Sequence, residues 1–234
     1  MKRTLVISDI HGELKKFEQL LGEVEYDPEF DQLILLGDYV DRGPNSKGVI
    51  EKVMSLKEAG ALLLKGNHED LMIKALTTDI ERSWNHWIKL CGGDKTLFSY
   101  GFSEIDIAAS EEKFQKPELQ SSTLNKHLEF IQGLENYIET SDYIFVHAGV
   151  HPTTPIAETD PHILMWIRDE FHKGYNGEKI VIFGHTETNS LHRDINNNNV
   201  YFGSNRIVGI DGGAVYGGQL NCLELPSQKV FSVK

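Results

Sequence analysis

Side chains of the kinds that bind metal ions follow five apolar runs in this sequence. The runs are "TLVIS", "QLILLG", "ALLLKG", "YIFV" and "IVIFG", and the side chains after them are Asp9, His11, Asp38, Asn67, His147 and His185. Carboxylates mixed with imidazoles favour manganese, iron or zinc over magnesium or calcium, and the lack of a cysteine among them excludes a thiolate-rich zinc site. Two ions are the natural number, because one aspartate can bridge cations about 3.5 to 4 Å apart and activate a shared water for attack on phosphorus.

Taken singly, some of these residues have simpler explanations. His147 and His185 would each more often be a core histidine than a ligand. Asp38 could be the N-cap of a helix. A cap at Asp38, however, explains neither Asp41 nor Arg42, which follow three and four residues later.

His11 and His68 also have simpler explanations when each is taken alone. His11 alone would more often be a turn or surface residue. The pattern "D-x-H-G" places Asp9 and His11 on one side of an extended segment, and Gly12 permits the close turn that follows. Asn67 and His68 could be a cap and a first-turn histidine. Ligand-type residues at five separate strand ends are nevertheless hard to obtain from five independent causes.

In the first 75 residues strands and helices are expected to alternate, and the turns between them carry the candidate side chains of this part of the chain. An apolar run, a turn rich in Asp, Gly or His, and a segment with helical spacing occur three times in succession. This is the β-α-β-α-β-α rhythm of an α/β protein. The turns at the carboxyl ends of such strands line the crevice where ligands bind.

The pattern changes in the middle of the chain. Residues 78–138 show mostly helical spacing, which predicts an inserted helical cap within one domain that spans residues 1–234. After it we expect strands at "YIFVHAG", "HILMWIR" and "IVIFGHT", followed by a β-rich tail. The run "NNNN" at 196–199 is interpreted as a turn between strands.

Composition and charge narrow the class of partner. The formal charge of −12, with no basic cluster, argues against extended nucleic acid. Cys91 and Cys222 cannot form a disulfide framework, and the first residues do not resemble a signal peptide, so a cytoplasmic protein is expected. No apolar stretch approaches the roughly 20 residues of a bilayer span, so no membrane partner is expected. The sequence makes no prediction of oligomeric state.

Five short blocks together carry a resemblance to a known family. They are "SDIHG" (8–12), "GDYVDRG" (37–43), "GNHED" (66–70), "HAG" (147–149) and "GHT" (184–186). In this order they resemble the phosphoprotein phosphatase (PPP) family of metallophosphoesterases. The resemblance implies a calcineurin-like α/β fold, a β-sandwich of two mixed sheets flanked by helices, with a small helical cap. Ser8 stands where the family more often has glycine, a small change that leaves both neighbouring ligands in place.

The resemblance also implies a role for each metal ligand. Asp9 and His11 would hold the first metal, and Asp38 would bridge to the second. The remaining ligands of the second metal would be Asn67, His147 and His185. The implied cofactors are two divalent ions, with manganese preferred over iron or zinc.

Four further residues acquire catalytic roles by the same resemblance. His68 resembles the general acid that protonates the leaving oxygen, with Asp41 paired to it to keep the imidazole protonated. Arg42 and Arg168 resemble the two arginines that clamp the phosphate, a task suited to the planar guanidinium. A metal-bridging hydroxide would attack directly, with no phosphoenzyme.

The resemblance predicts a phosphatase acting on phosphomonoesters, with phosphoserine or phosphothreonine in proteins preferred over a small phosphate-containing molecule. A second interpretation concerns "GIDGGAVYGGQLNCLEL" (209–225), which resembles the C-terminal block of bacterial diadenosine tetraphosphate hydrolases. Trp84, Trp87 and Tyr100 could stack on adenine, although tryptophans three residues apart on a helix are more often core contacts.

Two other classes of function receive less weight. A non-catalytic phosphopeptide-binding scaffold would be free to lose His68 or a ligand, and this chain keeps all of them. A nuclease is opposed by the charge of −12 and by the pair Asp41 and Arg42, which resembles the phosphomonoesterase branch.

Overall fold

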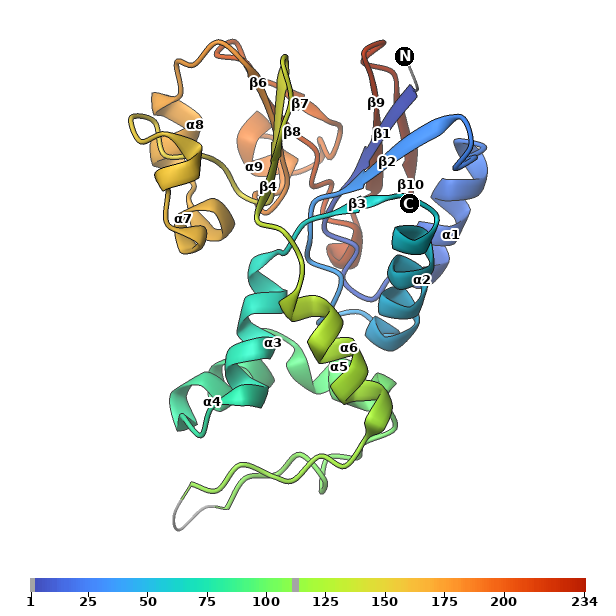
Figure 1. Cartoon of the computed structure of the whole chain (residues 1–234), viewed down its shortest axis with the longest axis vertical. Coiled ribbons are helices and arrows are strands. Elements are labelled where there is room, and N and C mark those ends of the chain that lie inside the picture. Colours follow the sequence, from blue (N-terminus) through green and yellow to red (C-terminus); the bar gives the residue numbers. More distant parts are fainter. Residues whose placement is uncertain (1–2, 111–113) are drawn as a thin grey trace.

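Two five-stranded sheets stand face to face in the computed structural model, which describes residues 3–110 and 114–234 (Figure 1). The first sheet has the order β10-β9-β1-β2-β3 and contains β1 (Arg3–Ile7), β2 (Asp31–Leu35), β3 (Leu62–Leu63), β9 (Leu220–Leu225) and β10 (Val230–Val233). The second has the order β4-β5-β6-β8-β7 and contains β4 (Tyr137–Glu139), β5 (Tyr143–Val146), β6 (Ile180–Phe183), β7 (Tyr201–Phe202) and β8 (Ile207–Gly209). Parallel and antiparallel pairs occur in both sheets, so both are mixed.

Alternating side chains of the strands divide the core into layers. In β1, Val6 faces a cluster that includes Phe145 and Ile182 of the other sheet, whereas Leu5 and Ile7 face the helices on the outer side. This follows from the two-residue period of a strand. The predicted sandwich of two mixed sheets flanked by helices is confirmed.

The predicted β-α-β-α-β-α order at the start of the chain is also confirmed. The three helices are α1 (Leu14–Glu23), α2 (Ser46–Glu58) and α3 (Asn67–Thr77). Asn45 caps α2 by accepting a hydrogen bond from the backbone N–H of Gly48, so Asp38 is not the cap of that helix. Each turn after a strand is therefore free to contribute side chains to one end of the sheet.

The helical segment in the middle of the chain lies below the sheets in Figure 1. It contains α4 (Glu81–Leu90), α5 (Gly93–Ser99) and α6 (Ser122–Gln132). It ends earlier than the expected residue 138, because Tyr137–Glu139 forms β4 and pairs with β5. Trp84 and Trp87 belong to the same apolar cluster as Phe17 and Val53, so this segment shares one core with α1 and α2.

The prediction of a strand at "HILMWIR" is wrong. Residues Pro161–Trp166 form helix α7, which is followed by α8 (Asp169–Gly174). The Asp160 side chain accepts a hydrogen bond from the backbone N–H of His162, and Pro161 occupies the first turn, both of which are helix-start features.

Shorter elements complete the described part of the chain. They are η1 (Ile156–Glu158), α9 (Thr188–His192) and η2 (Ala214–Tyr216). The asparagine run at 196–199 lies in the connection from α9 to β7, which contains a turn with a hydrogen bond from the Asn197 N–H to the carbonyl oxygen of Asp194. The predicted turn is present, but a helix precedes it where a strand was expected. Among the described helices, none combines the length and the apolar character needed to cross a bilayer.

Candidate metal centre and active site

The strand ends bring buried histidines and carboxylates into two groups that share one residue. One group is His11, Asp38 and His68, and the other is Asp38, His147 and His185. In each group the candidate ligand atoms all lie within 4.8 Å of one another. Asp38 is 2% exposed and stands between the groups, which is the position that a shared carboxylate requires.

Several predicted site residues have a strained backbone conformation. Ten residues other than glycine have positive φ in the described part of the chain. Six of them are predicted site residues: Asp9, His11, Asp38, Asp41, Arg42 and His185. Such conformations are unfavourable for residues with a Cβ and persist where surrounding contacts enforce them, often at functional sites.

Hydrogen bonds fix which ring nitrogen of two histidines carries the hydrogen. Nδ1 of His11 lies 2.8 Å from the carbonyl oxygen of Val40, and Nδ1 of His147 lies 2.9 Å from that of Leu36. A carbonyl oxygen only accepts, so Nδ1 carries the hydrogen in both rings. Burial lowers the pKa of His147 to about 4 and that of His11 well below its usual value. Both rings are therefore neutral, with a lone pair on Nε2.

Beside Asp38, the lone pair of a histidine nitrogen and the side-chain oxygens around it lie close together, although each of these atoms is a hydrogen-bond acceptor. Nε2 of His147 is 2.9 Å from Oδ1 of Asn67 and 3.5 Å from Oδ2 of Asp38. Burial raises the pKa of Asp38 well above its usual value, and the nearby carboxylates of Asp9 and Glu69 raise it further. A divalent cation would relieve these repulsions, and donor atoms around one ion lie roughly 3 Å apart for bonds of roughly 2.1 Å. The donor set therefore fits a metal ion.

His185 and Asp9 complete the cluster in different ways. Nδ1 of His185 lies 2.8 Å from Oδ1 of Asn67, while its Nε2 is buried without a hydrogen-bond partner. The backbone N–H of His185 donates to both oxygens of Asp9. Asp9 itself belongs to neither group of candidate ligands. A Cβ at Gly184 would lie 2.1 Å from Oδ2 of Asp9, so glycine is required there.

Asp41 and His68 form a buried pair next to the cluster. Nδ1 of His68 lies 2.7 Å from Oδ2 of Asp41. Burial raises the pKa of Asp41 to about 8 and lowers that of His68 well below its usual value. Burial thus disfavours a charge on either partner alone, so His68 can be protonated only when Asp41 beside it is ionised.

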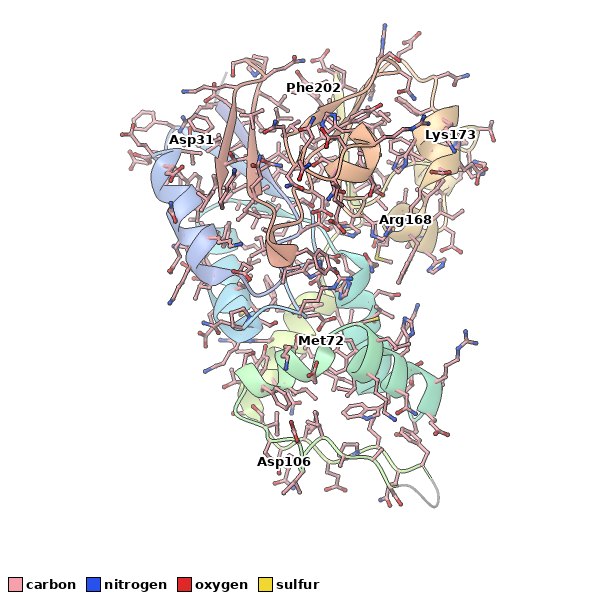
Figure 2. All side chains as sticks on the ribbon, turned by 180° about the vertical axis from the view of Figure 1, so that it is seen from behind. Asp31, Met72, Asp106, Arg168, Lys173 and Phe202 are labelled. Atoms are coloured by element: carbon pink, nitrogen blue, oxygen red, sulfur yellow. The ribbon has the colours of Figure 1, made fainter. Side chains whose placement is uncertain are left out.

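Two arginines reach one small cavity over the cluster. The cavity has a volume of about 220 Å³, and His11, Arg42, Arg168 and His185 are among its lining residues. Nη1 of Arg42 lies 2.7 Å from Nε2 of His11, and Nη1 of Arg168 donates to Oγ1 of Thr186 at 2.9 Å. Figure 2 shows Arg168 beside α7 and α8 in the part of the molecule that contains the sheets. The predicted arginine pair is thus brought together, although Arg168 follows a helix and not a strand.

A larger cavity of about 650 Å³ lies elsewhere, between α3, α6 and residues 114–120. None of the predicted site residues lines it. The chemistry of the described residues therefore points to the smaller cavity.

This geometry can be compared with known proteins. The family model for calcineurin-like phosphoesterases matches residues 2–218. The chain belongs to this family. The predicted family membership is confirmed, and the protein is a metallophosphoesterase, a metal-dependent hydrolase of phosphoric esters.

Proteins similar to this metallophosphoesterase include a protein phosphatase and dinucleoside tetraphosphatases. Serine/threonine-protein phosphatase 1 of Salmonella typhimurium is 30% identical over 220 residues, which cover 92% of this chain and 88% of the relative. The asymmetrical bis(5'-nucleosyl)-tetraphosphatase PrpE of Oceanobacillus iheyensis is 25% identical over 255 residues, covering 97% and 90%. A crystal structure provisionally called a diadenosine tetraphosphatase has a TM-score of 0.70 at 22% identity. The match covers 99% of this chain and 93% of the chain in that structure, and it supports the fold described above.

Two acidic residues of the metallophosphoesterase site were not predicted. Asp211 is buried, lines the small cavity and has its pKa raised well above the usual value by burial and by Asp9. It follows β8, so its place at a strand end was the available signal, as for the candidate ligands. Glu69 lies directly after Asn67 and His68, and its position in the first turn of α3 was the available signal.

Glu69 binds the loop that carries Asp38. One of its carboxylate oxygens accepts from the backbone N–H groups of Asp38 and Gly66, and the other accepts from those of Tyr39 and Val40. The side chain is fully buried, and burial raises its pKa to about 7. Glu69 therefore joins the start of α3 to the turn after β2.

Replacing Glu69 with glutamine is expected to lower the free energy of unfolding by about 2 to 3 kcal/mol. In the native protein each carboxylate oxygen accepts from two backbone N–H groups. Whichever way the glutamine amide is turned, its NH₂ group would replace one of these oxygens and leave two N–H groups without their acceptor. Urea denaturation of the metal-free protein measures the change. Glu81→Gln, an exposed change in the first turn of α4, is the control and should shift stability by less than about 0.5 kcal/mol. Equal stability of the two variants would contradict this role of Glu69.

Proposed function

We propose that this metallophosphoesterase hydrolyses phosphomonoesters, with phosphoserine and phosphothreonine of proteins as its substrates. The observation that supports this most is the small cavity lined by Arg42 and Arg168. Its volume of about 220 Å³ is below the roughly 300 to 1,000 Å³ of pockets that enclose a whole small molecule. A phosphoryl group fits such a cavity while the rest of the substrate stays outside, as a phosphorylated protein segment would. The Salmonella relative named a serine/threonine phosphatase is consistent with this choice.

The metal ligands of this proposal come from the two groups at the strand ends. Asp9, His11 and Asp38 would hold one ion, and Asp38 would share the other with Asn67, His147 and His185. When bound, the two divalent ions would neutralise charge on the phosphoryl group and lower the pKa of a water molecule. Mixed oxygen and imidazole donors favour manganese, with iron or zinc as substitutes.

The remaining residues of the proposal bind the phosphate and move a proton. The guanidinium groups of Arg42 and Arg168 each donate hydrogen bonds to phosphoryl oxygens. His68 donates a proton to the leaving oxygen through Nε2, since its Nδ1 is held by Asp41. The leaving alkoxide is thus released as an alcohol.

A second candidate function is hydrolysis of dinucleoside polyphosphates, and one observation favours it. The ring of Tyr216 is 58% exposed at the rim of the same cavity, 5.2 Å from the guanidinium of Arg42. An exposed ring there can stack on a nucleobase. Trp84 and Trp87 cannot, because they are 2% and 0% exposed, so the suggestion that they stack on adenine is wrong. Tyr100 is engaged by the ring of His127.

One assay separates the two candidates. The manganese-loaded protein is given a phosphoserine peptide, a phosphotyrosine peptide and diadenosine tetraphosphate, and kcat/KM is measured for each. The phosphoserine peptide is expected to exceed the dinucleotide by at least about tenfold. The reverse order would reject the proposal in favour of the second candidate. In that case Tyr216→Ala should reduce hydrolysis of the dinucleotide more than that of the peptides.

A further inference from the structure

The helical segment below the sheets supplies the groups that hold Asp41. Trp87, on α4, donates its indole N–H to both carboxylate oxygens of Asp41, each at 3.0 Å. Thr96, on α5, donates its hydroxyl to Oδ1 at 2.7 Å. All three residues are fully buried. The carboxylate that contacts His68 is therefore held on its other sides by two residues about 50 positions away in the sequence.

The hydrogens in this cluster can be assigned one by one. The indole N–H of Trp87 only donates, and an ionised Asp41 only accepts, so Nδ1 of His68 then carries the hydrogen of their contact. The backbone N–H of Asp41 donates to Oγ1 of Thr96 at 2.8 Å, and this hydroxyl lies 2.7 Å from Oδ1 of Asp41 and 3.0 Å from Oγ of Ser46. Ser46 can donate to Thr96, whereas an ionised carboxylate only accepts, so the Thr96 hydrogen goes to Asp41. Three donors thus fix the plane of the Asp41 carboxylate, and this plane fixes the ring of His68.

Two glycines at the start of α5, Gly92 just before it and Gly93 as its first residue, allow the close approach. The carbonyl oxygen of Gly92 accepts from the backbone N–H of Arg42 at 3.2 Å. A Cβ at Gly92 would lie 2.7 Å from the backbone nitrogen of Arg42, and a Cβ at Gly93 would lie 2.5 Å from the ring of Trp87. The helical segment is therefore packed directly against Asp41 and Arg42, with no room for a side chain between them.

We propose that Trp87 and Thr96 are positioning residues, which orient the general acid His68 through Asp41. This inference rests on the proposed role of His68. Proton donation in the transition state requires Nε2 of His68 to point at the leaving oxygen, and a ring free to rotate about its Asp41 contact loses that alignment. The helical segment is thereby part of the catalytic architecture as well as a covering of the sheet ends.

Phosphate esters with different leaving groups test the proposal. Phenyl phosphate has a poor leaving group and needs the general acid, whereas p-nitrophenyl phosphate has a good one and needs it less. Trp87→Phe keeps the ring and removes the N–H. It is expected to lower kcat about tenfold for phenyl phosphate and less than about threefold for p-nitrophenyl phosphate, with KM unchanged. Thr96→Val should act in the same direction, and Thr96→Ser, which keeps the hydroxyl, should restore most of the rate.

Trp84→Phe is the matched control. Trp84 lies one turn earlier on α4, is 2% exposed and is not among the donors to Asp41. A purely structural effect would lower kcat equally for both esters, or would make Trp87→Phe and Trp84→Phe behave alike. Either result would overturn the proposal.

A double variant separates this inference from the proposed function. The variant Asp41→Asn lacks the carboxylate through which Trp87 is proposed to act. The double variant Asp41→Asn with Trp87→Phe should therefore have a kcat less than about twofold below that of Asp41→Asn alone. A further tenfold loss would overturn the positioning role while leaving His68 as the acid. If His68→Asn itself lowers the rates of both esters equally, the acid assignment fails, and the positioning role with it.

Discussion

Replacing Asp38 with asparagine is expected to lower kcat/KM for a phosphoserine peptide by at least about 1,000-fold, which corresponds to about 4 kcal/mol. Asp38 is the one residue common to both groups of candidate ligands, so an ion bound by either group would contact its carboxylate. The amide keeps the shape and removes that charge. Its backbone role is retained, because the N–H of His68 donates to Oδ1, which asparagine also provides.

Metal content and activity are measured together on this variant. Inductively coupled plasma mass spectrometry of the manganese-loaded protein should find fewer than two ions per chain. Asp70→Asn is the control, since Asp70 lies on the same helix α3 as His68 and pairs with Lys74 at the surface. It should keep two ions and near-normal kcat/KM. Full metal content and activity in Asp38→Asn would contradict a bridging role.

Replacing His68 with asparagine is expected to lower kcat about 100- to 1,000-fold while leaving both metal ions bound. Asparagine cannot protonate the leaving oxygen. His68 shares one candidate group with His11 and Asp38, but its Nδ1 is engaged by Asp41 and the resemblance gives it no ligand role. Loss of rate with retention of metal therefore separates an acid from a ligand.

Steady-state kinetics and metal analysis of the same sample test this second variant. His192→Asn is the control, because His192 lies on α9 and its Nε2 contacts the carbonyl oxygen of Asn199. Its kcat should change by less than about twofold. A His68→Asn protein that turns over substrate at the normal rate would contradict the acid role, and one that has lost an ion would make His68 a ligand.

The positions of the candidate ligands could be predicted because each follows directly from local sequence. A buried strand followed by Asp, Asn or His places that side chain at the carboxyl end of a sheet, whichever strands become neighbours. Asp211, after β8, could have been predicted in the same way. The contact of His147 with the carbonyl of Leu36 could not, because the two residues are 111 positions apart in the sequence, and this contact decides which nitrogen of the ring carries the hydrogen.

The helix α7 shows where periodicity stops being informative. "HILMWIR" is a short apolar run, and such a run is compatible with a buried strand or with one face of a helix. Asp160 and Pro161 were the deciding residues, because capping and fixed φ favour a helix start. Arg168 reaches the cavity from the junction between α7 and α8, and its position depends on this helix.

The tryptophans show a second limit. Their spacing of three predicted a shared face of one helix, and the core interpretation is confirmed for both. Spacing could not distinguish Trp84 from Trp87, however. Only the folded arrangement brings the indole N–H of Trp87 to Asp41, and this contact turns a core residue into a candidate for a functional role.

Two cations held at the strand ends, with Asp38 between them, would be visible by anomalous diffraction at the manganese edge from crystals of the manganese-loaded protein. We expect two peaks about 3.5 to 4 Å apart, on either side of the Asp38 carboxylate. One near His11 and Asp9 and the other near Asn67 and His147 would satisfy this expectation. A map with no peak within bonding distance of Asp38, or with only one, would contradict it.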